Sequence, residues 1–127
     1  MAVPHKALLV DDEPHVRMYV KLILAGLGVD EIIEAKNGLQ GLEAYAEHRP
    51  DLVVLDVNMP EMDGLTALSK LQEADPDAVV IMMTSLASRD VVETAAKSGA
   101  VEYIRKDLPR SEVTELFRRA FEELFDE

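Results

Sequence analysis

The chain has 127 residues with 25 acidic and 13 basic side chains, a formal net charge of −12 and no cysteine. This length fits one domain with a sizeable core, so residues 1–127 are expected to form a single domain, and the lack of cysteine excludes disulfide staples and thiol catalysis. The acidic balance argues against nucleic acid or an anionic membrane as a direct partner, and without the apolar run of a signal peptide or of a bilayer-spanning helix the chain is expected to be cytoplasmic.

Five short apolar runs alternate with five segments of helical periodicity along the chain. The apolar runs predict strands at residues 7–10, 31–35, 51–56, 78–84 and 101–104. Three of these runs are continuously hydrophobic, as expected for strands that are covered on both faces in a parallel sheet.

The segments that follow the apolar runs predict helices. The first places its apolar residues on one stripe and stops at a pair of glycines, and the second and third start at the plausible caps Asn37 and Asp63. In chain order the five helices are expected at residues 14–28, 37–49, 63–75, 88–99 and 110–125. Five strand–helix pairs with short joins imply an α/β fold, a doubly wound sandwich with a parallel five-stranded sheet and helices on both faces.

Polar and charged residues follow the apolar runs. They are Asp11 and Asp12 after the first run, Asp56 at the end of the third, Thr84 and Ser85 after the fourth, and Lys106 just past the fifth. In open parallel sheets ligands bind at the carboxyl ends of the strands, so these side chains would share one edge of the molecule. A single aspartate at a strand end is usually a loop or capping residue, whereas the whole set indicates a site.

The chemistry of this set restricts what it could do. Two carboxylates about 5 Å apart repel by roughly 3 kcal/mol at an effective dielectric near 20, so the cluster needs a cation or a raised pKa. Hard oxygen ligands suit Mg²⁺, or Mn²⁺ as a substitute. With a metal present, a carboxylate can attack phosphorus while a lysine stabilises the transferring oxygens. The set therefore predicts an aspartyl phosphate at Asp56, with Mg²⁺ and Lys106 neutralising its charge.

Four motifs, LLVDDEP, LDVNMPEMDG, MMTS and GAVEYIRK, give the chain a family resemblance over essentially its whole length. It resembles the receiver domain of two-component response regulators, of which the single-domain chemotaxis regulator is the minimal example. The resemblance implies a flavodoxin-like (βα)5 fold with strand order 2-1-3-4-5. It also implies a phosphorylation-dependent signalling switch, which takes part in its own phosphotransfer but is not otherwise an enzyme.

The resemblance also assigns roles to individual residues. Asp56 would accept a phosphoryl group from a histidine kinase or phosphotransfer protein. The implied Mg²⁺ ligands are Asp12, Asp56 and the main-chain carbonyl of Asn58, with Asp11 acting through water. The phosphoryl group would contact Thr84, with Ser85 beside it, and Lys106, while Tyr103 would swing inward. The output face, made by the fourth helix, the fifth strand and the last helix, would include Ala87 to Lys97, Tyr103 and the last helix. It would bind a downstream protein or a second copy of the chain.

Three positions depart from the family pattern or affect its chemistry. The family usually has proline after the lysine, but Asp107 stands here. Because a cis bond before a non-proline residue costs roughly 3–4 kcal/mol, this peptide is expected to be trans, which puts the aim of Lys106 in question. Asn58 and Leu86 flank the path of the water that hydrolyses the phosphoaspartate in this family. Leucine cannot hydrogen-bond that water, so slow self-dephosphorylation is predicted.

Several alternatives remain open from the sequence. Asp11 or Asp12 could cap the helix that Pro14 begins. The chain could be a receiver-like contact module without phosphorylation. A haloacid-dehalogenase-type phosphatase would need an acid at position 58, which is Asn, and a flavodoxin would need a phosphate loop in place of the acidic DDEPH. The apolar stripe on the last helix is expected to be mostly core, but its breadth could also present Phe117, Phe121 or Phe125 to a partner.

Overall fold

The computed structural model describes residues 3–59, 62–85 and 89–125 and contains one sheet of five parallel strands. The strands are β1 (Lys6–Val10), β2 (Glu31–Ala35), β3 (Leu52–Asp56), β4 (Val80–Thr84) and β5 (Glu102–Arg105). Their order is β2-β1-β3-β4-β5, which confirms the flavodoxin-like order 2-1-3-4-5 expected from the sequence. Every residue of β3 and β4 is buried, because helices cover both faces of the sheet.

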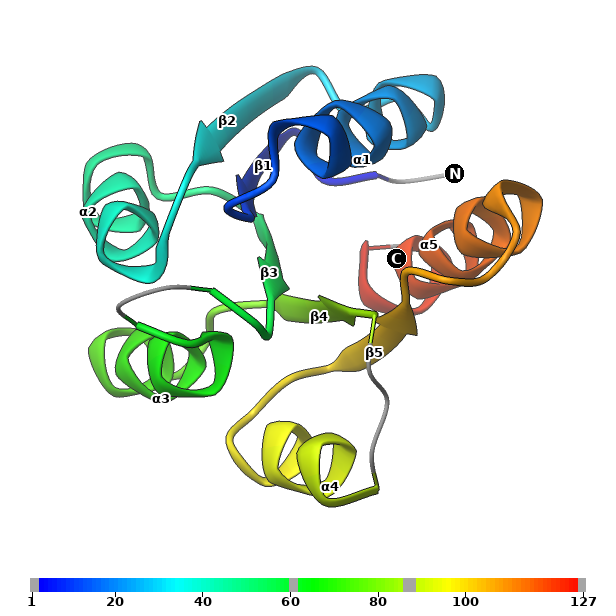
Figure 1. The fold of residues 1–127 in the computed structure, drawn as a ribbon. Helices are drawn as coiled ribbons and strands as arrows, with labels where there is room; N and C mark the ends of the chain where they lie inside the picture. The colour runs from blue at the N-terminus through cyan, green and yellow to red at the C-terminus, as the bar shows by residue number, and fades with distance from the viewer. Residues whose placement is uncertain (1–2, 60–61, 86–88, 126–127) are drawn as a thin grey trace.

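In the described part of the chain, one helix follows each of the five strands. The helices are α1 (Pro14–Gly26), α2 (Gly38–His48), α3 (Gly64–Ala74), α4 (Arg89–Lys97) and α5 (Arg110–Phe125). Figure 1 shows α1 and α5 on one side of the sheet and α2, α3 and α4 on the other. The predicted caps are confirmed: Asn37 accepts a hydrogen bond from the main chain of Gln40, and Asp63 accepts one from that of Thr66.

The core divides into two layers that match the two faces of the sheet. One layer joins β-strand side chains to α1 and α5, and the other joins them to α2, α3 and α4. Phe117 and Phe121 are fully buried in the first layer, which confirms that the stripe on the last helix is mostly core and rules out the alternative that these two side chains meet a partner. Phe125 is half-buried against the same layer. Within the described part of the chain, no helix has the length and apolar character needed to cross a bilayer.

Candidate functional site

Three carboxylates meet at the carboxyl edge of the sheet. Asp11 and Asp12 follow β1, and Asp56 ends β3, the strand that pairs directly with β1. One carboxylate oxygen from each of the three lies within 4.8 Å of the others. Asp56 and Asp11 are only 4% and 6% exposed, whereas Asp12 lies open to solvent. The structure thus brings together three acids that the strand ends predicted to be neighbours.

Lys106 supplies the positive charge at this cluster. Its ammonium donates to Asp11 Oδ2 at 2.6 Å and lies 2.9 Å from Asp56 Oδ1, and its side chain is 13% exposed. Its main-chain N–H donates to the carbonyl of Thr84 at 2.7 Å, which extends the register of β4 and β5 up to the site. One ammonium therefore bridges the two buried acids.

The replacement of the usual proline by Asp107 does not turn Lys106 away from the site. No peptide bond among the described residues is cis, as predicted for the bond before Asp107. The Asp107 carboxylate accepts two hydrogen bonds from the Arg105 guanidinium, at 3.0 and 2.5 Å, so it is paired on the outer side of the turn. Lys106 therefore still points at Asp11 and Asp56, while Asp107 pairs with Arg105.

Burial and hydrogen bonding compete at Asp56 and Lys106, and burial prevails at Asp56 alone. Burial raises the pKa of Asp56 from 3.8 to about 6; the hydrogen bond from Lys106 opposes this effect, and the charge of Asp11 adds to it. Desolvation lowers the pKa of Lys106, but its hydrogen bonds to Asp11 and Asp56 outweigh that effect and raise it above its ordinary value. At neutral pH Lys106 is charged, and Asp56 is ionised at a cost in stability.

This cost predicts an unusual pH dependence. In the native state Asp56 binds a proton below about pH 6. In the unfolded chain the same carboxylate binds a proton only below its ordinary pKa of 3.8. Protonation of Asp56 therefore stabilises the native state at acidic pH. This contribution to the free energy of unfolding, about 3 kcal/mol in total, is lost as the pH rises through about 6. In metal-free buffer the Asp56→Asn variant is expected to be about 2–3 kcal/mol more stable than the wild type at pH 7.5, with the difference shrinking towards pH 4.5.

Urea unfolding followed by far-ultraviolet circular dichroism across that pH range measures this difference. Glu43→Gln, on the exposed face of α2, controls for the change in net charge. An Asp56→Asn variant that is less stable than the wild type at pH 7.5 would show that the pair with Lys106 outweighs the burial cost.

The donor set fits a hard divalent cation. Three carboxylates face one ammonium, and all the side-chain donors are oxygens, the ligands that Mg²⁺ and Mn²⁺ prefer. Among the described residues no hydrogen bond engages the Asp12 side chain, and Asn58, two residues after Asp56 in the chain, is exposed. Helix capping does not account for the acids, because Glu13 is the N-cap of α1 and makes no side-chain capping bond.

Thr84 and Tyr103 are coupled behind the cluster. Thr84 is fully buried, Ser85 is exposed, and Tyr103 is half-buried. Burial raises the pKa of Tyr103, while a hydrogen bond between its hydroxyl and that of Thr84 lowers it and the charge of Asp56 raises it further. The side chain of Tyr103 therefore interacts with that of Thr84. Leu86, to which the sequence assigned the tuning of dephosphorylation, lies outside the described residues.

Gly64 is a contributor that the sequence reasoning left without a role. A Cβ at this position would lie 2.0 Å from the carbonyl oxygen of Asp56 and 2.7 Å from the Cα of Val57. The Gly64 N–H donates to the carbonyl of Val57 at 2.7 Å. The first turn of α3 therefore lies directly against the end of β3, and only glycine fits there. The signal was present in the Met-Asp-Gly triplet that precedes the helix.

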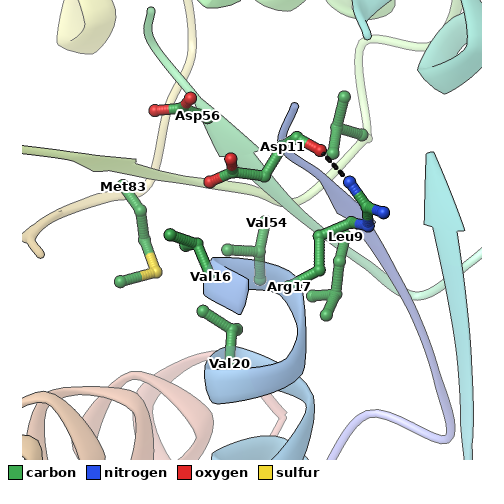
Figure 2. Close-up of a pocket in the computed structure, with 9 residues that line it drawn as sticks. Leu9, Asp11, Val16, Arg17, Val20, Val54, Asp56 and Met83 are labelled. Carbon is green, nitrogen blue, oxygen red and sulfur yellow. Dashed lines mark hydrogen bonds between the residues drawn. The ribbon is translucent and has the colours of Figure 1, made fainter. Parts of the chain in front are cut away.

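Arg17 is a second residue that was missed. Its Nη1 donates to the main-chain carbonyl of Asp11 at 2.6 Å, and it lines a cavity of about 10 Å³ together with Asp11 and Asp56. Figure 2 shows this hydrogen bond beside the two acids, with apolar side chains from β1, β3, β4 and α1 around them. A basic residue on the inner side of an otherwise apolar helix stripe was the available signal.

Comparison with known proteins places the chain in a family. A family model described as response regulator receiver domain matches residues 7–118. The chemotaxis protein CheY of Bacillus subtilis is 40% identical over 115 residues, which are 91% of this chain and 96% of that protein. A protein-glutamate methylesterase/protein-glutamine glutaminase of Archaeoglobus fulgidus is 45% identical over 103 residues, 80% of this chain but 29% of that enzyme.

Solved structures agree with the sequence relatives. The match to the crystal structure of the CheX–CheY–BeF3–Mg complex from Borrelia burgdorferi has a TM-score of 0.87 at 33% identity and covers 94% of this chain and 90% of that one. A CheY-like receiver domain from Methanospirillum hungatei matches with a TM-score of 0.83 at 27% identity, over 93% of this chain and 94% of that one. The chain therefore belongs to the response regulator receiver family and is a phosphorylation-dependent signalling switch related to CheY.

Proposed function

We propose that Asp56 is the phosphoacceptor of this receiver domain and that it is phosphorylated in a Mg²⁺-dependent reaction. The observation that carries the proposal is the buried Asp56 carboxylate at the end of β3, 2.9 Å from the Lys106 ammonium and within 4.8 Å of oxygens from Asp11 and Asp12. This arrangement has a nucleophile, a fixed positive charge and a set of oxygen ligands at one point.

The residues of the chain would divide the phosphotransfer among them. A carboxylate oxygen of Asp56 forms a bond to phosphorus as the nitrogen–phosphorus bond of a donor phosphohistidine breaks, and the imidazole keeps the electron pair and takes up a proton. With a pKa of about 6, Asp56 is mostly ionised at pH 7.5 and can act as the nucleophile. Lys106, which pairs with this carboxylate before the reaction, would then pair with the new phosphoryl oxygens.

The cation would be held by the acids and by one main-chain group. We assign direct ligation to Asp12, Asp56 and the carbonyl of Asn58, and a water-mediated role to Asp11. The Asp11 carboxylate already accepts hydrogen bonds from Lys106 and from the N–H of Glu13, which favours an indirect role. A bound Mg²⁺ would supply neutralisation of the charge on the phosphoryl oxygens.

Phosphorylation would be read through Thr84 and Tyr103. The Thr84 hydroxyl, with Ser85 beside it, would exchange its bond to Tyr103 for a bond to a phosphoryl oxygen, and Tyr103 would repack against β5 and α4. A groove of about 200 Å³ lies at this place, lined by residues of α4, of β5 and of the connection between them. Tyr103 of β5 lines it, together with Val101 of the connection, which is 44% exposed. A change in this groove would alter the affinity of the α4–β5–α5 face for a protein.

A phosphorylation switch of this kind needs two partners, a phosphoryl donor and a target of the output face. The phosphoryl donor would be a histidine kinase or a phosphotransfer protein, and the output a protein contact at the α4–β5–α5 face or a dimer through it. The related CheY of Borrelia burgdorferi was solved in a complex with CheX, which supports a protein as the partner. The formal net charge of −12 disfavours nucleic acid as a partner.

We further propose that residues 1–127 act as one receiver domain and as a switch, not as an enzyme, although some related receivers are parts of methylesterases.

Intact mass after incubation with acetyl phosphate and Mg²⁺ tests the proposal. One phosphoryl adduct is expected on the wild type, and none on Asp56→Asn or in a sample treated with a chelator. An adduct on Asp56→Asn would place the acceptor elsewhere. The wild type should also be tested with a panel of phosphohistidine donors. If no donor gives an adduct, whether or not Mg²⁺ binds, the result would favour a receiver that works by protein contact alone.

A further inference from the structure

Arg17 holds the peptide unit that joins two of the site acids. Its Nη1 donates to the main-chain carbonyl of Asp11 at 2.6 Å. The carbonyl of Asp11 and the N–H of Asp12 belong to one planar peptide. The orientation of this plane sets the directions in which the Asp11 and Asp12 side chains leave the backbone.

The guanidinium is itself anchored at a second point. Its Nε donates to Glu34 Oε1 on β2 at 3.1 Å, and the Arg17 side chain is only 11% exposed. The adjacent residue of β2, Ala35, accepts the N–H of Asp11 at 3.1 Å. Arg17 therefore holds the carbonyl of Asp11 while β2 holds its N–H, and the fork of the guanidinium makes both of its bonds at once.

The remaining polar atoms of Asp11 are also occupied. Its Oδ1 accepts from the N–H of Glu13 at 2.9 Å, and its Oδ2 accepts from Lys106. The next residue, Asp12, has no such support from the described residues, because its side chain is exposed and outside the hydrogen-bond network. The backbone at the Asp11–Asp12 peptide is thus what aims the Asp12 carboxylate, and the hydrogen bond from Arg17 is a fixed point of that backbone (Figure 2).

We propose that Arg17 is a positioning residue for the divalent-cation site, acting through the Asp11–Asp12 peptide. This inference rests on the proposed function, because it assumes that the acids bind Mg²⁺. Arg17 carries a positive charge close to a cation site, so its charge alone opposes Mg²⁺ binding. Positioning and charge therefore predict opposite results when the guanidinium is removed.

Titration calorimetry of Mg²⁺ into the unphosphorylated protein separates the two effects. Arg17→Met keeps the aliphatic stem and removes the guanidinium, and the dissociation constant for Mg²⁺ is expected to rise about tenfold. Arg17→Lys keeps the charge but makes one of the two bonds at a time, and a rise of about threefold is expected. The control is Lys21→Met, because Lys21 pairs with the same Glu34 at 3.6 Å but makes no hydrogen bond to Asp11. The Lys21→Met variant should bind Mg²⁺ as tightly as the wild type or slightly more tightly.

A spectroscopic readout reports the peptide directly. Loss of the hydrogen bond to the Asp11 carbonyl should shift the ¹⁵N resonance of the Asp12 amide in Arg17→Met but not in Lys21→Met. A merely structural role would lower the urea midpoint without changing the Mg²⁺ affinity of the folded protein. If Arg17→Met does not fold, Arg17→Lys carries the test.

The outcomes are distinguishable. Mg²⁺ binding that is equal or tighter in Arg17→Met, or in Arg17→Lys if only that variant folds, would overturn the positioning role while leaving the metal site intact. A wild-type protein that does not bind Mg²⁺ would overturn both the positioning role and the proposed function.

Discussion

Gly64→Ala is expected to destabilise the native protein by about 3 kcal/mol and to weaken Mg²⁺ binding. The added Cβ would lie 2.0 Å from the Asp56 carbonyl oxygen and 2.8 Å from its carbonyl carbon, and both are main-chain atoms that cannot rotate away. Relief requires α3 to move from the end of β3, which breaks the hydrogen bond from Gly64 to Val57 and shifts the backbone that carries the Asp56 carboxylate. Urea unfolding and Mg²⁺ calorimetry measure the two effects.

Gly26→Ala is the matched control for this substitution. Gly26 is the last residue of α1, it is exposed, and a Cβ there would meet nothing within 4 Å. Because alanine is the better helix former, this variant is expected to be neutral or more stable by up to about 1 kcal/mol. Equal stability losses in the two variants would mean that the contact at Gly64 does not matter.

Lys106→Met is expected to cost about 3 kcal/mol of stability at pH 8 in metal-free buffer. The substitution leaves Asp11 and Asp56 buried together without the ammonium that lies 2.6 and 2.9 Å from them. Since the hydrogen bond from Lys106 lowers the pKa of Asp56, its loss moves that pKa above 6. The deficit should therefore be present at pH 8 and shrink below pH 6, where Asp56 is protonated with or without the lysine.

Mg²⁺ provides a second readout for the same variant. Without Lys106 on the oxygens of Asp11 and Asp56, saturating Mg²⁺ should restore more stability to the variant than it adds to the wild type. Lys70→Met, on the exposed surface of α3, controls for the loss of one positive charge. A deficit that is equal at pH 5 and pH 8, and unaffected by Mg²⁺, would show that Lys106 acts through the packing of its stem and not through its charge.

Local sequence patterns were sufficient for the elements and for the three acids and the lysine that meet at the edge of the sheet. Continuous apolar runs marked β3 and β4, and the side chains of Asn37 and Asp63 marked the starts of α2 and α3 because capping depends on residues only three positions apart. The strand ends then nominated Asp11, Asp12, Asp56 and Lys106, since parallel strands bring their carboxyl ends to one edge whatever the details of packing.

Contacts between elements could not be predicted in the same way. The bounds of α5 and the mostly core character of its apolar stripe were predicted correctly. Whether Phe117, Phe121 or Phe125 also meets a partner stayed open, because the burial of each ring depends on how the helix packs on the sheet. The effect of Asp107 was also undecided, because the ion pair that holds it to Arg105 depends on the shape of the turn after β5.

By itself the sequence determined the class of the fold, the strand edge that carries the site and the chemical character of the residues there. These properties follow from periodicity and from residue type, which are local. Only the tertiary structure decided that Lys106 bridges Asp11 and Asp56, that Thr84 engages Tyr103, that Gly64 lies against the Asp56 carbonyl and that Arg17 reaches the Asp11 carbonyl. Each of these contacts joins different elements, up to 95 residues apart, and a contact of a few ångströms depends on register, packing and rotamer, which no local pattern encodes.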